Sequence, residues 1–130
     1  MDMSERTEIS TSDAPQNDNP YSQGRRVGDH LYVSGFGPVD PKTGTEVDGD
    51  IEAQTTRVLE SLRGVVEAGG GTIDDVVKVT VYLTDLEDYE RMNEAYGAAF
   101  SEPLPTRVCV EVSRLPGDVA VEMDAIAHLG

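Results

Sequence analysis

Cysteine occurs only once in this chain, at Cys109, and tryptophan does not occur at all. A single cysteine excludes an internal disulfide, so a reducing compartment such as the cytoplasm is expected. The N-terminal residues lack the basic start and apolar run of a secretory signal. No segment is long and apolar enough to cross a membrane. Together these absences predict a cytoplasmic protein without a membrane partner.

Basic side chains are also scarce. Ten lysines and arginines stand against 25 aspartates and glutamates, which gives a net charge of -15 and a pI near 4.2. Such a chain repels phosphate backbones, so no nucleic-acid partner is expected. The acidic residues are spread along the whole chain, which fits either ordinary acidic solubility or adaptation to high salt.

The domain organisation follows from length and local composition. A chain of 130 residues suits one domain with one modest hydrophobic core. Its first residues are polar and rich in Ser, Thr, Asp and Asn, and a regular pattern begins near Pro20. We therefore expect a flexible leader over residues 1–18 and a single domain over residues 19–130.

Hydrophobic periodicity predicts both helices and strands. Asp50 can cap a helix that ends at the glycines of residues 69–71, and Pro103 stops a second helix. The expected elements are strands over residues 30–34, 76–83, 106–113 and 120–128, and helices over residues 51–68 and 89–100.

These elements predict an α+β fold in which two helices pack on one face of a sheet. The turn at residues 115–118 suggests that the last two strands pair as an antiparallel hairpin. Val108, Val110 and Val112 are expected to face the core, with Arg107 on the other side. That other side mixes apolar and charged residues and has no cover, which suggests an oligomer.

Arg107 and Glu122 are the leading candidates for chemistry. Arg107 begins a strand, and its planar guanidinium could grip a carboxylate through two hydrogen bonds. Glu122, expected on the same side of a neighbouring strand, could accept a proton or orient water. The alternatives are a surface arginine paired with Glu111 or Asp124, and a structural ion pair between Glu122 and Arg107 or Arg114.

Four further residues could form a pocket, although each has a plainer explanation. Asn93 lies on the apolar side of the second helix, where it could bind a ligand or a nearby carbonyl. Tyr21 could wall a pocket or simply anchor the chain after the leader. Ser34 and Gly35 end a strand and could approach a ligand closely or form an ordinary turn.

Cys109 is more consistent with an inert, buried thiol than with a nucleophile. Its only possible imidazole partners are His30 and His128, and neither spacing supports a catalytic pair. The same three residues do not make a convincing metal site, so no metal is expected. The glycines at 69–71 follow a helix and therefore act as a cap, not as a phosphate-binding loop.

Several ordered motifs resemble the RidA/YjgF family of reactive-intermediate deaminases. The similarity runs from about Asn19 to the C-terminus. The matching segments are Pro20–Gly24, Ser34–Gly35, Pro38–Gly44, Asn93–Tyr96, Pro105–Leu115 and Val121–Met123. Several motifs at the right spacing are a far more specific signal than any one of them.

The resemblance implies a chorismate-mutase-like α+β fold and a homotrimer with ligand sites in clefts between subunits. It implies hydrolysis of enamines and imines derived from amino acids, such as 2-aminoacrylate and 2-iminopropanoate, to a 2-oxo acid and ammonia, without metal or organic cofactor. By the same resemblance, Arg107 binds the substrate carboxylate and Glu122 positions or activates water. Tyr21, Ser34, Gly35, Asn93 and Cys109 match positions that line the family's pocket.

Two departures and two rival functions accompany the resemblance. Phe36 and Gly37 stand where many members have Gln and then Ile or Val, which affects the expected pocket shape. Some members have been assigned endoribonuclease activity, but the charge of -15 disfavours RNA binding. A ligand-sensing or chaperone-like trimer is the other alternative, and a pocket sealed by Phe36 would favour it.

Overall fold

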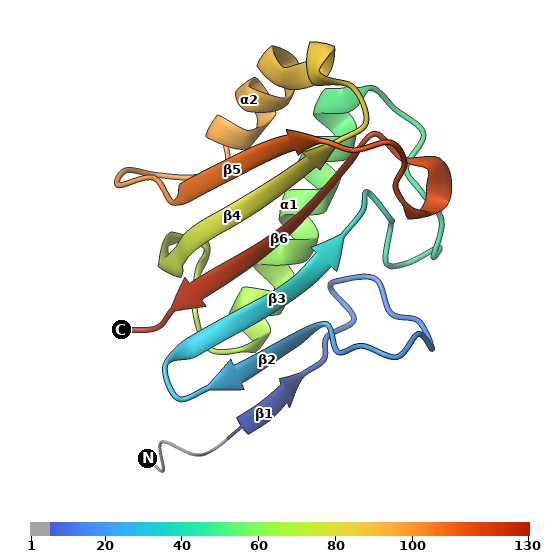
Figure 1. Ribbon diagram of the computed structural model, residues 1–130. Coiled ribbons are helices and arrows are strands. Elements are labelled where there is room, and N and C mark those ends of the chain that lie inside the picture. The colour runs from blue at the N-terminus through green and yellow to red at the C-terminus, as the bar shows by residue number, and fades with distance from the viewer. Residues whose placement is uncertain (1–5) are drawn as a thin grey trace.

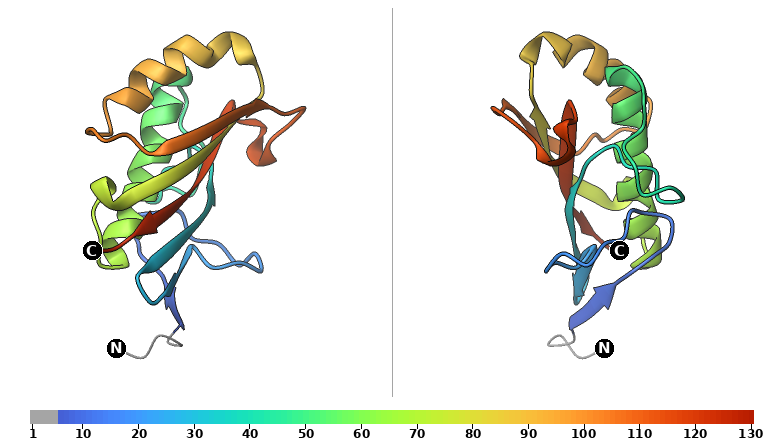
Figure 2. Two further views of the ribbon diagram at one scale, coloured as in Figure 1. Left: turned by 60° about the vertical axis from the view of Figure 1, so that its left-hand side comes forward. Right: turned by 90° about the vertical axis from the view of Figure 1, so that its right-hand side faces the viewer.

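A six-stranded sheet carries two helices on one of its faces (Figures 1 and 2). The structure is a computed structural model and describes residues 6–130. The strands are β1 (Arg6–Ile9), β2 (Gly24–Val27), β3 (His30–Phe36), β4 (Val76–Leu83), β5 (Thr106–Glu111) and β6 (Val121–His128). The helices are α1 (Ile51–Ala68) and α2 (Tyr89–Gly97), with 3-10 turns at Ile73–Asp75, Leu86–Asp88 and Pro116–Asp118. The predicted α+β fold is confirmed.

The strand order is β1-β2-β3-β6-β4-β5, so the last strand of the chain lies inside the sheet. β6 pairs antiparallel with both β3 and β4, whereas β5 pairs only with β4, in parallel. The expected hairpin of the last two strands is therefore wrong. A parallel pair requires a crossover, which α2 provides between β4 and β5. After β5, residues 112–120 cross the end of β4 and lead the chain to β6 on the other side of that strand.

Helix α1 forms the main cover of the sheet. The Asp50 carboxylate accepts a hydrogen bond from the Ala53 amide at 2.9 Å, which caps the first turn as expected. The helix ends where Gly70 takes a φ of +101°, a conformation that favours glycine. Its buried side chains, among them Val58, Leu62 and Val65, pack on the sheet and make most of the core with the inward residues of β3, β4 and β6.

The N-terminal segment corrects one prediction. β1 pairs antiparallel with β2, and Ile9 and Ala14 are buried in the core. The Gln23 side-chain amide donates to the carbonyl oxygens of Thr11, Ala14 and Pro15, which holds the segment against the domain. A flexible leader over residues 1–18 is thus wrong for residues 6–18, because burial and hydrogen bonds fix them. Residues 1–5 lie outside the described part of the chain.

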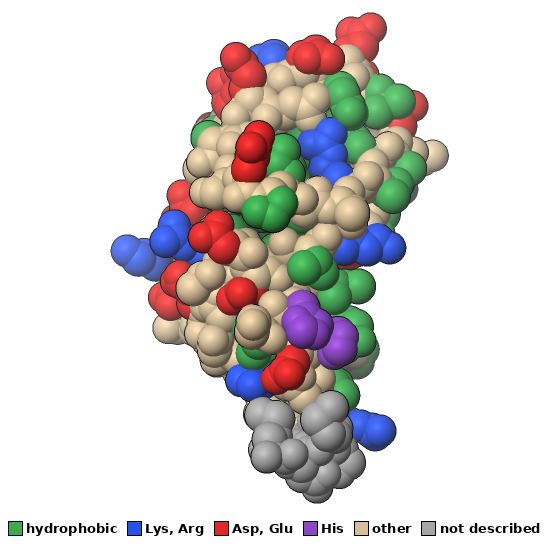
Figure 3. Space-filling view, turned by 90° about the vertical axis from the view of Figure 1, so that its left-hand side faces the viewer, with side chains coloured by type: hydrophobic (Ala, Val, Ile, Leu, Met, Phe, Trp, Pro, Cys, Tyr) green, Lys and Arg blue, Asp and Glu red, His purple; other side chains and the backbone are tan. Residues whose placement is uncertain are grey.

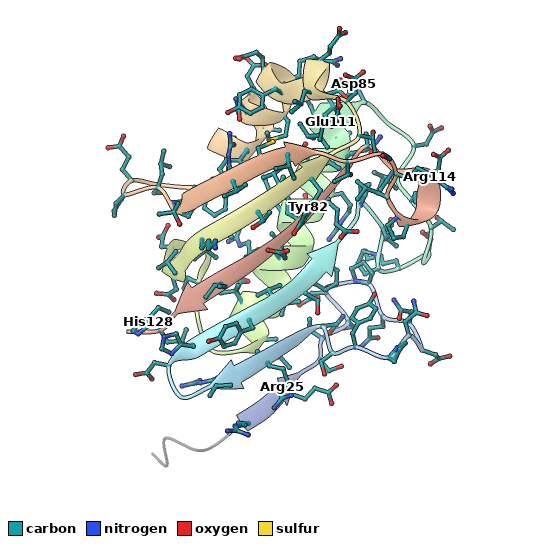
Figure 4. The ribbon with its side chains drawn as sticks, in the orientation of Figure 1. Arg25, Tyr82, Asp85, Glu111, Arg114 and His128 are labelled. Carbon is teal, nitrogen blue, oxygen red and sulfur yellow. The ribbon has the colours of Figure 1, made fainter. Side chains whose placement is uncertain are left out.

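Strand β5 faces the opposite way from the prediction. Cys109 packs against the core and Arg107 lies beneath α2, whereas Val108 and Val110 remain 50% and 39% exposed on the far face. The valines and the polar residues alternate as expected, but the alternation alone does not reveal which set faces the helices. We call the helix-free side of the sheet the open face. It also carries Tyr32, which is exposed, and the side chain of Glu122. Tyr82, the partner of Glu122 on β4, lies on the same face (Figure 4).

Candidate functional site

Arg107 lies on the helix side of the edge strand β5, where two tyrosines of α2 frame its guanidinium. The guanidinium carbon is 5.5 Å from the centre of the Tyr89 ring and 4.8 Å from that of Tyr96. One terminal nitrogen donates to the Tyr89 hydroxyl at 3.0 Å, and the other lies 4.0 Å from the Met92 sulfur. Within residues 6–130 no carboxylate forms an ion pair with Arg107.

The alternative partners suggested for Arg107 are engaged elsewhere. Glu111 accepts a hydrogen bond from the Leu86 amide at 3.0 Å, and Asp124 accepts one from the Tyr82 hydroxyl at 3.0 Å. The flat faces of the Arg107 guanidinium therefore contact the Tyr89 and Tyr96 rings, while its N–H edge keeps free hydrogen-bond donors. Such a fork can accept the carboxylate of a small ligand.

Asn93 and Cys109 lie on the same side of the sheet as Arg107. Asn93 is half-buried on α2, and its side-chain oxygen has no hydrogen-bond partner in the described chain. Burial raises the pKa of the Cys109 thiol, an effect that the charge of Arg107 only partly opposes. A raised pKa keeps the sulfur protonated, which fits a wall residue better than a nucleophile.

The two histidines do not approach this thiol. His30 and His128 are paired across β3 and β6, and their rings meet edge to face with centroids 4.8 Å apart (Figure 3). Both histidines lie on the open face, at the end of the sheet where β3 begins and β6 ends, whereas Cys109 faces the core. Residues 6–130 contain no group of three or more His, Cys, Asp or Glu placed to hold a metal.

A second set of predicted residues lines a cavity of about 640 Å³ at the other side of the molecule. Tyr21, Ser34, Gly35 and Glu122 all contribute to its wall. The remaining lining comes from residues 15–19, from Phe36 at the end of β3 and the loop after it, and from residues 116–119. The sequence motifs therefore predicted four residues of the cavity wall, including its carboxylate Glu122, but not the contribution of residues 15–17.

Gly35, near the end of β3, forms the part of the cavity wall that lies against Glu122. A side chain at Gly35 would place its first carbon 2.7 Å from a Glu122 carboxylate oxygen, so a larger residue there would force the Glu122 side chain to shift. The Ser34 hydroxyl donates to the Ser22 carbonyl and ties β3 to the segment before β2. Phe36 is only 4% exposed and packs in the core, and it also forms part of the wall of this cavity.

Glu122 has an unusual electrostatic environment for a carboxylate. Partial burial raises its pKa above the ordinary value of 4.5, and the negative charge of Asp124 raises it further. A carboxylate with a raised pKa can give and take protons closer to neutral pH. Glu122 thus has the properties of an acid–base group, while its cavity can hold a small polar molecule.

The structure divides the predicted site into two parts, which we call the arginine half and the glutamate half. The arginine half contains Arg107, Asn93 and Cys109, and the glutamate half contains Glu122 and the cavity around it. β4 separates the two strands, pairing with Arg107 at Val79 and with Glu122 at Tyr82. Arg107 points to the helix side and Glu122 to the open face, so the expectation that they share a side of adjacent strands is wrong within one chain.

Comparison with known proteins covers nearly the whole chain. The family model described as endoribonuclease L-PSP matches residues 11–129. A RutC family protein of Pyrococcus abyssi is 52% identical over 120 residues, which cover 92% of this chain and 94% of that protein. The 2-iminobutanoate/2-iminopropanoate deaminase of Escherichia coli K12 is 45% identical over 122 residues, again 92% and 94% of the two chains. The chain belongs to the RidA/YjgF family.

A solved structure at 39% identity confirms the architecture. The crystal structure of Escherichia coli TdcF with bound serine superposes with a TM-score of 0.90 at 39% identity, covering 95% of this chain and 99% of that one. The family resemblance seen in the motifs is therefore confirmed, together with the fold it implied. No helix within residues 6–130 has the length and apolar character needed to span a membrane.

Proposed function

We propose that this RidA/YjgF protein hydrolyses small 2-imino and enamine carboxylates, such as 2-iminopropanoate and its enamine form 2-aminoacrylate, to the 2-oxo acid and ammonia. The observation that carries the proposal is Arg107, a half-buried cation with rings on its faces and free donors on its edge. A family relative at 45% identity bears the name of this activity. In the related TdcF the bound ligand is serine, which also has a carboxylate beside a nitrogen-bearing carbon.

A complete site, in this proposal, forms between copies of the chain in a homotrimer. Arg107 lies on the edge strand β5, and the glutamate half opens on the helix-free side of the sheet. A neighbour that covers this open face could bring its own β5 edge to the cavity. Exposed Tyr32, Val108 and Val110 give the open face the apolar area that such an interface needs.

The proposed mechanism assigns one task to each half of the site. Arg107 of one copy binds the substrate carboxylate and places the imine carbon beside a water molecule. Glu122 of the next copy takes a proton from that water as its oxygen bonds to the carbon. The same carboxyl group passes this proton to the nitrogen, which gives a carbinolamine. It then carries the hydroxyl proton to the nitrogen as well, so that the carbon–nitrogen bond breaks, the carbonyl of the 2-oxo acid forms and ammonia leaves. Imines hydrolyse without a catalyst, so orientation and one proton shuttle suffice.

Endoribonuclease activity is the less favoured function, although the family model carries that description. A charge of -15 opposes the counterion release on which phosphate-backbone binding depends. Acidic and basic side chains are interspersed on the face shown in Figure 3, without a continuous basic surface. A ligand-binding or chaperone-like role remains the alternative, and the assay below separates it from catalysis.

The test supplies the imine continuously and measures its fate. A serine dehydratase generates 2-aminoacrylate in the presence of semicarbazide, which traps the imine, and pyruvate formation is followed with and without the protein. The protein should raise the rate of pyruvate formation and lower the amount of semicarbazone. Arg107→Ala should lose roughly 100-fold in kcat/KM, because the substrate carboxylate loses its charged partner.

Glu122→Gln keeps the shape of the side chain and should lower kcat by about 100-fold or more, since it removes the proton shuttle. Lys42→Ala, in the exposed turn after β3, is the matched loss of a positive charge and should retain full activity. Equal semicarbazone with and without the wild-type protein would contradict the deaminase proposal and favour a binding role.

A further inference from the structure

We propose that Tyr89 and Tyr96 are positioning residues that hold the Arg107 guanidinium in the plane needed to bind a carboxylate. The inference rests on the proposed function for the identity of that carboxylate, but the placement of the guanidinium can be tested without it. Neither tyrosine belongs to the set of site residues that the sequence indicated.

The spacing of the two tyrosines places both rings against one cation. Tyr89 and Tyr96 are seven residues apart, two turns of α2, so they lie on the same side of the helix. Their ring centres are 5.5 and 4.8 Å from the Arg107 guanidinium carbon, both within the range of a cation–π contact. The guanidinium is thereby held on β5 by the helix that crosses above it.

The two rings have different roles because they differ in burial. Tyr96 is 7% exposed and packs on Phe100, with ring centroids 4.7 Å apart, so it forms a fixed inner wall. Burial raises the pKa of Tyr96 to about 12, against a lowering effect of Arg107, so the ring stays neutral. Tyr89 is partly exposed and adds one directed contact, the hydrogen bond from Arg107 to its hydroxyl at 3.0 Å.

Aromatic neighbours suit a ligand-binding arginine better than a carboxylate neighbour would. A protein carboxylate would occupy the N–H edge of the guanidinium and compete with the substrate for the same donors. Rings contact the faces and leave most of that edge available. Within residues 6–130, Arg57, Arg63 and Arg91 have carboxylate partners, whereas Arg107 has the two rings and the Met92 sulfur.

Kinetics of four variants test the positioning role. Tyr96→Leu and Tyr89→Leu each remove a ring and should raise KM about tenfold, with kcat within about twofold of wild type. Tyr89→Phe keeps the ring but loses the hydrogen bond and should raise KM several-fold. Tyr96→Phe keeps the ring and loses only a hydroxyl that has no hydrogen-bond partner in the described chain, so its KM should lie closer to that of wild type than the KM of Tyr96→Leu does.

A second measurement reports on Arg107 itself, independently of activity. Side-chain nitrogen spectra of the full-length protein labelled with ¹⁵N-arginine should show separate signals for the two terminal nitrogens of Arg107, because the contacts hinder rotation about the bond between its side-chain Nε and Cζ. Arg107→Lys assigns those signals by their loss. They should merge in Tyr96→Leu and Tyr89→Leu and stay separate in Tyr96→Phe.

The outcomes separate this inference from the proposed function. Unchanged Arg107 signals in both leucine variants, or a loss of kcat at constant KM, would overturn the positioning role. Wild-type protein that hydrolyses no imine, but whose Arg107 signals respond as described, would overturn the deaminase proposal and support the positioning role. If Tyr96→Leu does not fold, Tyr89→Leu decides the question, since Tyr89 lies at the surface.

Discussion

Arg107 and Glu122 differ in what surrounds their charges, and the difference suits the two tasks proposed for them. Arg107 meets neutral rings and a sulfur, so its charge is left to an incoming anion. Glu122 is partly buried and lies near the carboxylate of Asp124, so it holds a proton more readily than an exposed glutamate does. One group is thus prepared for binding and the other for proton transfer.

The pH dependence of activity should follow the raised pKa of Glu122. The ionised carboxylate accepts the proton of water, so activity should fall as pH drops through this pKa, at a pH above the ordinary value of 4.5. Asp124→Asn removes the second cause of the shift and should move this acidic limb to lower pH. The measurement is kcat/KM from pH 4 to 8, with the imine supplied by excess amino-acid oxidase.

Asp74→Asn provides the control for the loss of a negative charge, because Asp74 is exposed and absent from the cavity wall. Its profile should match that of the wild type. An acidic limb that stays in place in Asp124→Asn would show that Asp124 does not act on the proton-accepting group.

Residue motifs predicted the glutamate half of the site better than the surroundings of Arg107. Tyr21, Ser34, Gly35 and Glu122 do line one cavity. Tyr89 and Tyr96 stand at helical spacing, and aromatic residues at such spacing usually pack in a core. Their contact with Arg107 depends on the angle at which α2 crosses β5, and the local sequence pattern of either element does not predict that angle.

At the level of elements, hydrophobic alternation located the strands but did not orient β5. Val108 and Val110 looked like core residues because exposed valines are uncommon in a sheet. They lie instead on the open face, where an interface would cover them. The turn at residues 115–118 likewise suggested a hairpin, because sequence does not show that β4 separates β5 from β6.

β1 was missed because only one of its four residues is buried. Ile9→Ala should destabilise the protein by about 2–4 kcal/mol, since it opens a cavity where Ile9 packs in the core. Thr7→Ala, in the same strand but exposed, should change stability by no more than about 0.5 kcal/mol. Thermal and urea unfolding at one fixed protein concentration measure both. Equal, small effects would mean that β1 contributes little to the fold.

At the scale of the whole molecule, the proposed assembly would make activity a property of pairs of chains. Arg107→Ala and Glu122→Gln chains, each inactive alone, should recover activity when they are co-expressed in equal amounts. Random assembly gives an intact arginine half facing an intact glutamate half in about a quarter of the sites of a closed ring, so about a quarter of wild-type activity is expected. Size-exclusion chromatography with light scattering gives the assembly size.

Two controls accompany the mixture. The double variant, which carries both changes in one chain, should stay inactive when it is expressed alone. When it is co-expressed in equal amounts with wild type, about a quarter of the sites should be intact. A mixture of the two single variants that is as inactive as either alone, although it assembles like wild type, would place both residues of each site in the same chain.

The central place of β6 has a consequence for biosynthesis. Residues 121–128 are synthesised after the other five strands, yet they join β3 to β4 in the finished sheet. A nascent or prematurely terminated chain that ends before residue 121 would hold two separate ribbons, β1–β3 and β4–β5, each with an unpaired inner edge. Such edges are templates for aggregation. Chaperones or proteases that recognise unpaired strand edges would therefore meet them mainly before the eight residues of β6 have paired with β3 and β4.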